Sequence, residues 1–100
     1  MSRYVINILA SQDLNQIADY FTETNIEAGE QFFSDFNRKC KQLVAFPHSG
    51  KRYEEIRPDL RGLRLGDYIL FYRVLDADGV EILRVVSGRR NFPSLFGASD

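Results

Sequence analysis

The sequence predicts an α+β fold with the element order β-αα-βββ, in which a helical hairpin packs on one face of a small, mainly antiparallel sheet. Three observations predict it. Residues 61–91 are rich in β-branched and aromatic residues between tight-turn signals. Residues 12–46 carry apolar residues at helical spacing. A short β-branched run, residues 3–9, precedes them, and a chain of 100 residues is long enough for one domain with its own core.

The first half of the chain is expected to form one strand and two helices. The run 3–9 is the strand, which can join the later sheet. Ser11 is the expected N-cap of a first helix over residues 12–23, because its hydroxyl can accept a hydrogen bond from the first turn. Asn25 is expected to cap the second helix, which ends before Pro47 because proline cannot continue a helix. The apolar stripe of the second helix is Ala28, Phe32, Phe36, Cys40, Leu43 and Val44.

Residues 61–91 are expected to form three antiparallel strands. Gly66-Asp67 and Asp78-Gly79 supply the turns, since Gly and Asp tolerate the positive φ of tight hairpins. Alternation along each strand divides the side chains between two faces. The face expected to meet the helices holds Leu63, Leu65, Tyr68, Leu70, Tyr72, Val74, Leu83 and Val85. The opposite face holds Arg64, Ile69, Phe71, Arg73, Leu75, Ile82, Arg84 and Val86.

The opposite face of the predicted sheet combines three arginines with apolar side chains. Ordinary solvent exposure of the arginines is one interpretation. The apolar residues among them favour another, a surface covered by a partner, because a free monomer seldom leaves so much apolar surface contiguous. The residues expected to meet this partner are Arg64, Ile69, Phe71, Arg73 and Arg84.

The composition of the chain argues against several classes of protein. The formal net charge of -1 gives no support for a strongly basic nucleic-acid binder. The single cysteine, Cys40, cannot form an internal disulfide and is expected to pack as a small hydrophobic residue in a cytoplasmic protein. No apolar run is long enough to span a membrane. The sequence contains none of the motifs that mark P-loops, dinucleotide-binding turns or zinc sites. Neither a cofactor nor a metal is therefore expected.

The segment 48–59 is expected to be a connecting loop. It contains His48, the only histidine, whose place beside Pro47 does not suit the base of a serine-type triad. Metal-free RNA cleavage would need a base, a cation and an acid at one place. Arginines can supply the cation, but a guanidinium stays protonated and cannot readily serve as base or acid. Cleavage of RNA by attack of a 2′-hydroxyl stays the one catalytic alternative, and no residue is assigned a catalytic role.

Five stretches, taken in order, resemble the ParE branch of the RelE/ParE toxin superfamily. They are D-L-N-Q-I-A-D-Y-F, E-A-G-E-Q-F, F-P-H-S-G, L-R-G-L-R-L-G-D-Y-I-L-F-Y-R-V and V-E-I-L-R-V-V-S-G-R-R-N-F. The likeness runs almost from end to end. It implies a single bacterial toxin domain, residues 1–100, with the RelE/ParE-like fold and a co-expressed antitoxin that holds it inactive.

The resemblance implies one of two activities. ParE-like members act on DNA gyrase, whereas RelE-like members cleave messenger RNA on the ribosome, and the shared fold does not choose between them. In the nucleases an arginine stands at the position of Ile69 and a tyrosine at that of Phe96, although Arg90 matches a nuclease arginine. Many ParE-like chains have a histidine and an aspartate where this chain has Ser87 and Asn91. Gyrase inhibition without catalysis is the expected function, with a ribosome-dependent mRNA ribonuclease or a non-toxic binding module as alternatives.

The resemblance also implies two binding surfaces. A ParD-like antitoxin is expected to cover the face that holds Arg64, Ile69, Phe71, Arg73 and Arg84. The contact with gyrase is expected at Arg89, Arg90, Asn91 and Phe96, for which the alternative role is packing of the tail onto the body. Neither membrane binding nor direct sequence-specific binding of nucleic acid is expected.

Overall fold

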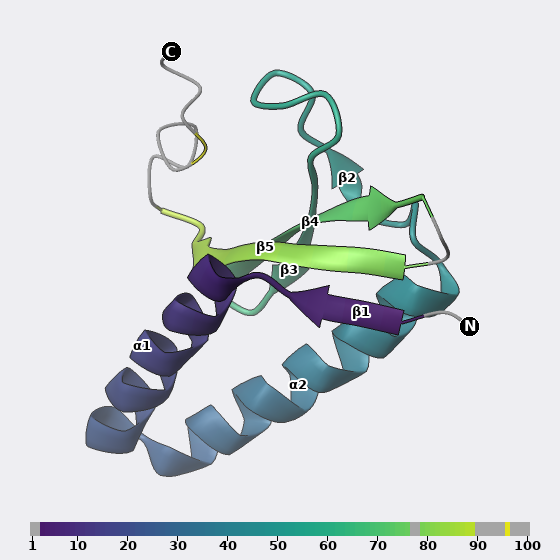
Figure 1. The fold of residues 1–100 in the computed structure, drawn as a ribbon. Helices are drawn as coiled ribbons and strands as arrows, with labels where there is room; N and C mark the ends of the chain where they lie inside the picture. The colour runs from purple at the N-terminus through teal and green to yellow at the C-terminus, as the bar shows by residue number, and fades with distance from the viewer. Residues whose placement is uncertain (1–2, 77–78, 90–95, 97–100) are drawn as a thin grey trace.

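Two helices cover one face of a five-stranded sheet in the computed structural model of the chain, which describes residues 3–76, 79–89 and 96 (Figure 1). The helices are α1 (Ile8–Thr24) and α2 (Ile26–Ala45). The strands are β1 (Arg3–Ile6), β2 (Lys51–Arg52), β3 (Arg61–Leu65), β4 (Tyr68–Leu75) and β5 (Gly79–Ser87). The predicted α+β class is confirmed, with β2 as one strand that the sequence did not predict.

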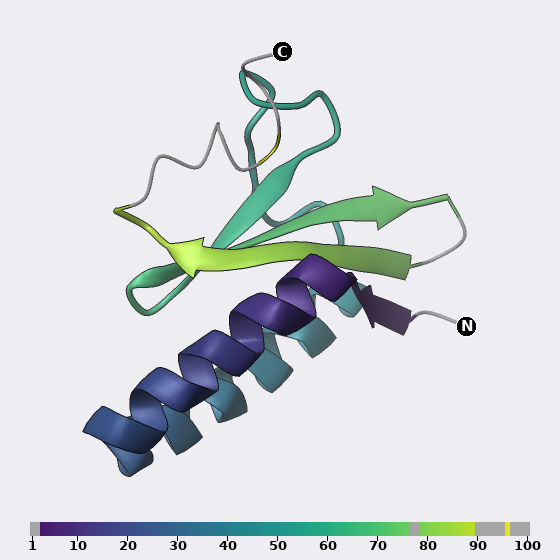
Figure 2. The same ribbon diagram turned by 60° about the vertical axis from the view of Figure 1, so that its left-hand side comes forward.

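The sheet is mixed. Its spatial order is β1-β5-β4-β3-β2, with β1 parallel to β5 and every other neighbouring pair antiparallel. Both helices lie on the same side of this sheet, as Figure 2 shows from a second direction. The helical hairpin of the prediction is therefore present and packs where it was expected.

Helix α1 begins earlier than predicted because Asn7 provides its N-cap. The Asn7 side-chain oxygen accepts a hydrogen bond from the Leu9 N–H at 2.8 Å, and the Asn7 carbonyl accepts one from Ser11 N–H at 2.9 Å. The prediction of Ser11 as N-cap is thus wrong, whereas the strand predicted over residues 3–9 is confirmed for Arg3–Ile6 and ends earlier than predicted. Asparagine caps helices as well as serine does, and here it stands one turn closer to the strand.

Helix α2 follows the prediction closely. Asn25 separates it from α1 and accepts a hydrogen bond from the Ala28 N–H at 3.1 Å, so the predicted cap is confirmed. The helix ends at Ala45, with Phe46 as its C-cap and Pro47 beyond.

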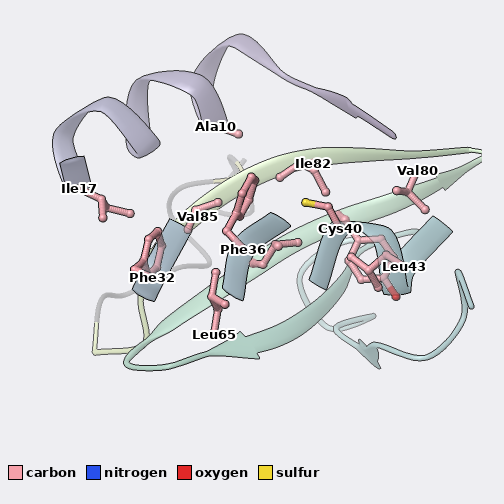
Figure 3. Close-up of a cluster of buried hydrophobic side chains, with 12 residues drawn as sticks. Ala10, Ile17, Phe32, Phe36, Cys40, Leu43, Leu65, Val80, Ile82 and Val85 are labelled. Carbon is pink, nitrogen blue, oxygen red and sulfur yellow. The ribbon is translucent and has the colours of Figure 1, made fainter. Parts of the chain in front are cut away.

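The main core lies between the helices and the sheet (Figure 3). The stripe of α2 supplies Phe32, Phe36, Cys40 and Leu43, as predicted. The remaining buried members are Ala10, Ile17, Leu65, Leu70, Tyr72, Val80, Ile82 and Val85. Burial raises the pKa of the Cys40 thiol to about 12, so this cysteine packs as a hydrophobic residue.

Tyr72 ties the connection after α2 to the sheet. Its hydroxyl is buried in the main core, donates a hydrogen bond to the Pro47 carbonyl at 2.7 Å and accepts one from the Gly50 N–H at 2.9 Å. A Cβ at Gly50 would lie 2.5 Å from that hydroxyl oxygen, so a side chain at Gly50 would collide with it. Burial also raises the pKa of Tyr72.

A β-bulge in β5 changes the predicted division of side chains. Phe71 pairs with Arg84, but the next residue, Tyr72, pairs with Ile82, so Leu83 is an extra residue on β5. Ile82 consequently joins the main core, and Leu83 lies on the opposite face. The predicted faces of these two residues are wrong, because alternation alone does not register an inserted residue.

The face opposite the helices is covered rather than open. Leu60, Ile69, Phe71, Leu83 and Val86 form a second cluster of buried residues, with Tyr53, Ile56 and Phe96 packed against it. The segment 53–60 folds over this face and is closed by a hydrogen bond from the Tyr53 N–H to the Leu60 carbonyl at 2.9 Å. The expectation of an exposed apolar face is wrong because this segment and Phe96 cover it.

Of the predicted turns, Gly66-Asp67 joins β3 to β4, and Gly66 has a φ of +60° that favours glycine. Asp78 of the second predicted turn lies outside the described residues.

Candidate functional site

The five residues predicted to bind a partner lie in three different environments. Arg64 is exposed, Arg73 and Arg84 are held in ion pairs, and Ile69 and Phe71 are buried in the second cluster. The sequence could place them on neighbouring strands, but it could not show which of them solvent reaches.

Arg84 is held by Asp13 of α1. Its Nε and Nη2 donate to the two carboxylate oxygens of Asp13 at 2.7 and 2.8 Å, and the side chains are 15% and 9% exposed. The Asp13 carboxylate also accepts a hydrogen bond from the Val85 N–H at 3.0 Å. The pKa of Arg84 is raised, chiefly by the hydrogen bond to Asp13. The charge of Arg84 is therefore neutralised within the fold by Asp13.

Arg73 forms a cross-strand ion pair with Glu81. The two residues are register partners on β4 and β5, and Arg73 Nε donates to Glu81 Oε1 at 2.7 Å. Glu81 Oε2 also accepts a hydrogen bond from Asn7 Nδ2 at 3.3 Å. The hydrogen bond to Arg73 is the main reason that the pKa of Glu81 is lowered. The Arg73 side chain remains 40% exposed, so a partner can still reach it.

Arg64 is exposed to solvent. Among the described residues, no acidic side chain forms an ion pair with it. Its Nε donates to the Gly66 carbonyl at 3.2 Å. The guanidinium also lies near the end of β5, since a Cβ at Gly88 would be 3.7 Å from Arg64 Nη1. A cation in this position can pair with a carboxylate or a phosphate of a bound molecule.

Ile69 and Phe71 are covered by aromatic side chains. The Phe71 ring packs edge-on against Tyr53 and Phe96, with ring centroids 5.1 and 5.2 Å apart. The Arg57 guanidinium lies 5.9 Å from the centroid of the Phe96 ring. A side chain at position 62 would force the Tyr53 ring to move, because a Cβ there would lie 2.7 Å from that ring. Ile69 and Phe71 are 6% and 0% exposed as a result.

The predicted target-binding segment is described in part. Arg89 is exposed, and its N–H donates to Ser87 Oγ at 3.3 Å. Phe96 is partly buried against the second cluster. Arg90 and Asn91 lie outside the described residues.

A shallow cavity lies beside the end of β5, and no sequence pattern indicated it. Its volume is about 250 Å³, and it lies between α1 and the adjoining ends of β4 and β5. Its lining includes Gln16, Tyr20, Tyr68 and Ser87, with Asp13 at one wall. Burial is the main cause of the raised pKa of Tyr68. The cavity could accept an apolar side chain with a polar end.

In residues 3–76, 79–89 and 96, His, Cys, Asp and Glu side chains do not gather in groups of three that could hold a metal ion. Neither helix of the described structure has the length and apolar character needed to cross a membrane.

Known proteins resemble this chain along most of its length. The family described as ParE toxin of type II toxin-antitoxin system, parDE, matches residues 4–92. Toxin ParE1 of Mycobacterium tuberculosis is 30% identical over 89 residues, which cover 88% of this chain and 91% of that protein. Toxin ParE3 of Caulobacter vibrioides is 28% identical over 98 residues, or 97% of each chain.

A solved structure agrees with these sequence matches. It is described as a chromosomal ParDE TA system from P. aeruginosa, and it aligns with a TM-score of 0.69 and 26% identity over 87% of this chain and 95% of that chain. Since the family match spans the sheet, the helices and the described sites, the chain belongs to the ParE toxin family of type II toxin-antitoxin systems.

Proposed function

We propose that this ParE-family toxin inhibits DNA gyrase by binding, without catalysis of its own, and is neutralised by a cognate ParD-like antitoxin. Membership of the ParE family supports the gyrase target, and the ParDE system of the similar solved structure supports the antitoxin. One observation favours an inhibitor over an mRNA ribonuclease. Ile69, which stands where related nucleases have an arginine, is 6% exposed and belongs to the second cluster.

The apolar environment of Ile69 argues against nuclease chemistry at this position. A nuclease must stabilise the charge that develops on the phosphoryl group, and removing one such contact costs a large part of the rate. Here the position contributes an apolar side chain to the same buried cluster as Phe71, on whose ring Tyr53 packs. Phe96 likewise replaces a phenol by a ring without a proton to donate. Both changes favour an inhibitor that acts by binding.

We place the antitoxin contact on the face of Arg64, Ile69, Phe71, Arg73 and Arg84, with unequal roles. Arg64 and Arg73 are accessible, so acidic side chains of the antitoxin can pair with them directly. Contact with Ile69 and Phe71 requires the segment 53–60 and Phe96 to move away. Arg84 would first have to leave Asp13, and breaking a buried ion pair is costly. The first contact is therefore assigned to Arg64 and Arg73.

We place the target contact at Arg89, Arg90, Asn91 and Phe96. Arg89 is exposed at the end of β5, and Arg64 reaches the same end through its approach to Gly88. Two arginines, Arg64 and Arg89, therefore lie at this end of the sheet, beside the single acidic residue Asp67 of the β3–β4 turn. Exposed guanidinium groups can pair with carboxylates of a target protein.

The test uses antitoxin-free protein in two assays. In the first, it is added to gyrase and supercoiled plasmid. In the second, it is added to ribosomes that translate a defined messenger. Accumulated double-strand breaks with intact messenger support the proposal. Cut messenger with undisturbed gyrase would replace it by the ribonuclease function, and no effect in either assay would leave a non-toxic binding module.

A pair of variants links the first assay to the proposed surface. Arg89→Glu reverses a charge in the target-binding segment and should weaken the effect on gyrase about tenfold or more, as expected for loss of a charged contact. Arg38→Glu changes an exposed arginine on α2, away from the end of β5, and serves as the matched control. Equal activity of both variants would remove Arg89 from the target contact.

A further inference from the structure

Within the described residues, no strand pairs with the outer edge of β1. β1 is the first strand of the sheet and pairs with β5 on one side only (Figure 1). The large apolar side chains that remain exposed in the described chain gather beside this edge. Of the seven, four lie in residues 5–9, at Val5, Ile6, Ile8 and Leu9. An open strand edge with apolar side chains is a template for pairing with another strand.

The direction of each backbone N–H and carbonyl decides which of them can form hydrogen bonds with a partner at this edge. The Asn7 N–H donates to the Ile82 carbonyl of β5. Because the backbone groups of successive residues in a strand point to opposite edges, those of Val5 also point to β5, and those of Tyr4 and Ile6 point outward. The open edge therefore presents two N–H groups and two carbonyls, spaced two residues apart.

We propose that β1 pairs with β1 of a second copy of this chain, in antiparallel register, about a two-fold axis through Val5. In this register the Tyr4 N–H and carbonyl meet the carbonyl and N–H of the second copy's Ile6, and the symmetric pair repeats the arrangement. All four outward groups of each strand are then satisfied, as in a hydrogen-bonded antiparallel ladder. Two five-stranded sheets become one continuous sheet.

The side chains suit this register. Tyr4 and Ile6 are register partners of the core residues Val80 and Ile82, so they face the helices and would pack against each other across the axis. Val5 lies on the other face and would meet the second copy's Val5. Pairs of such residues stabilise strand pairing, and no like charges oppose each other.

The one charged residue of β1 also fits. Arg3 would lie opposite the second copy's Asn7, and Asn7 Nδ2 lies 3.3 Å from the Glu81 carboxylate. The cation of one copy would thus approach the Glu81 carboxylate of the other, which also pairs with Arg73, at both ends of the paired strands. This complementarity is the reason for choosing a second copy over an unrelated strand.

The first test measures the association of antitoxin-free protein by sedimentation velocity across a dilution series. A reversible dimer is expected. Val5→Lys places two like charges at the two-fold axis and should give a monomer at concentrations where the original chain is dimeric. Ile26→Lys is the matched control, because Ile26 is an exposed apolar residue on α2, away from the edge, and should leave the dimer intact. Circular dichroism checks that both variants are folded.

A second pair of variants tests the strand pairing itself. Ile6→Pro removes an N–H that points away from β5, so it spares the sheet of each copy but removes two symmetric intermolecular hydrogen bonds. Association should weaken about tenfold or more. Ile6→Val keeps the N–H and should change the strength of association little.

Three results would overturn the proposal. They are a chain that stays monomeric throughout the dilution series, a dimer that Ile26→Lys disrupts and Val5→Lys does not, and a dimer that folded Ile6→Pro leaves unchanged. A chain that is monomeric alone, but whose β1 amides become protected from hydrogen exchange when antitoxin is added, would assign the edge to the antitoxin instead.

Discussion

Asp13 and Arg84 form a two-pronged ion pair across 71 residues of sequence, and this pair joins α1 to β5. It lies where β1 no longer covers the edge of β5, since the register of the two strands ends at Ile6 and Ile82. The Asp13 carboxylate accepts the Val85 N–H there, so a side chain replaces the missing strand as backbone partner. The same contact withdraws Arg84 from the surface that a partner can reach.

Asp13→Ala should destabilise the fold by about 3 kcal/mol or more, because it leaves a largely buried guanidinium and the Val85 N–H without their acceptor. Urea unfolding measures the change. Asp19→Ala is the control, since Asp19 is an exposed residue of the same helix. Adding Arg84→Met to the Asp13 variant should recover part of the loss, because it removes the unpaired charge. Equal stability of the Asp13 and Asp19 variants would contradict the role of the pair.

Tyr72→Phe should lower the free energy of unfolding by about 1–3 kcal/mol, because the Pro47 carbonyl and the Gly50 N–H would both lose a buried partner. The aromatic ring keeps its packing, so the effect isolates the hydroxyl. Tyr20→Phe removes a hydroxyl from a ring that is 56% exposed and should change stability little. Thermal or urea unfolding compares the two, and a Tyr72 variant as stable as the Tyr20 variant would count against this anchor.

The parts of the fold that follow from short sequence signals were predictable. Asn25 caps α2, Gly66 makes the first hairpin turn, and the spacing of Phe32, Phe36 and Cys40 defines the buried side of α2. Each depends on residues within a few positions of one another. The start of α1 was missed because two capping residues, Asn7 and Ser11, lie one turn apart and local propensity does not separate them.

The rest depends on contacts between distant segments. The bulge at Leu83 exists because the main core takes Ile82 and the second cluster takes Leu83, which alternation within β5 does not encode. The exposure of the candidate site residues depends on distant segments in the same way: strand parity placed Arg64, Ile69 and Phe71 on one face, but the cover by Tyr53 and Phe96 comes from elsewhere in the chain. A buried partner for an arginine likewise leaves no local sequence signal.

The ion pair of Arg73 and Glu81 predicts a dependence of stability on pH. Its hydrogen bond lowers the pKa of Glu81 in the folded chain below the ordinary 4.5 of the unfolded chain. The unfolded state therefore binds the proton more readily, so the stabilisation is complete above the unfolded pKa and is lost as the pH falls through the folded pKa. The difference in unfolding free energy between the original chain and Glu81→Gln should accordingly shrink below about pH 4.5.

Urea unfolding over a series of pH values measures this difference. Glu23→Gln is the matched control, because Glu23 is exposed on α1 and should show no comparable loss on acidification. A difference for Glu81 that stays constant down to acidic pH would show that the pair does not control this part of the pH profile.

Joint reversal of Arg64 and Arg73 to glutamate should weaken antitoxin binding by well over tenfold, since acidic groups of the antitoxin would then meet like charges. Arg64 alone should account for much of the change, because it is exposed and has no acidic partner in the described structure, whereas Arg73 already pairs with Glu81. Raising the salt concentration should weaken the binding of the original chain more than that of the double variant, because salt screens exposed charge pairs. Arg38→Glu, on the exposed side of α2, is the control and should bind as the original chain does. Isothermal titration with purified antitoxin compares the four proteins, and unchanged affinity of the folded double variant would remove this face from the antitoxin contact.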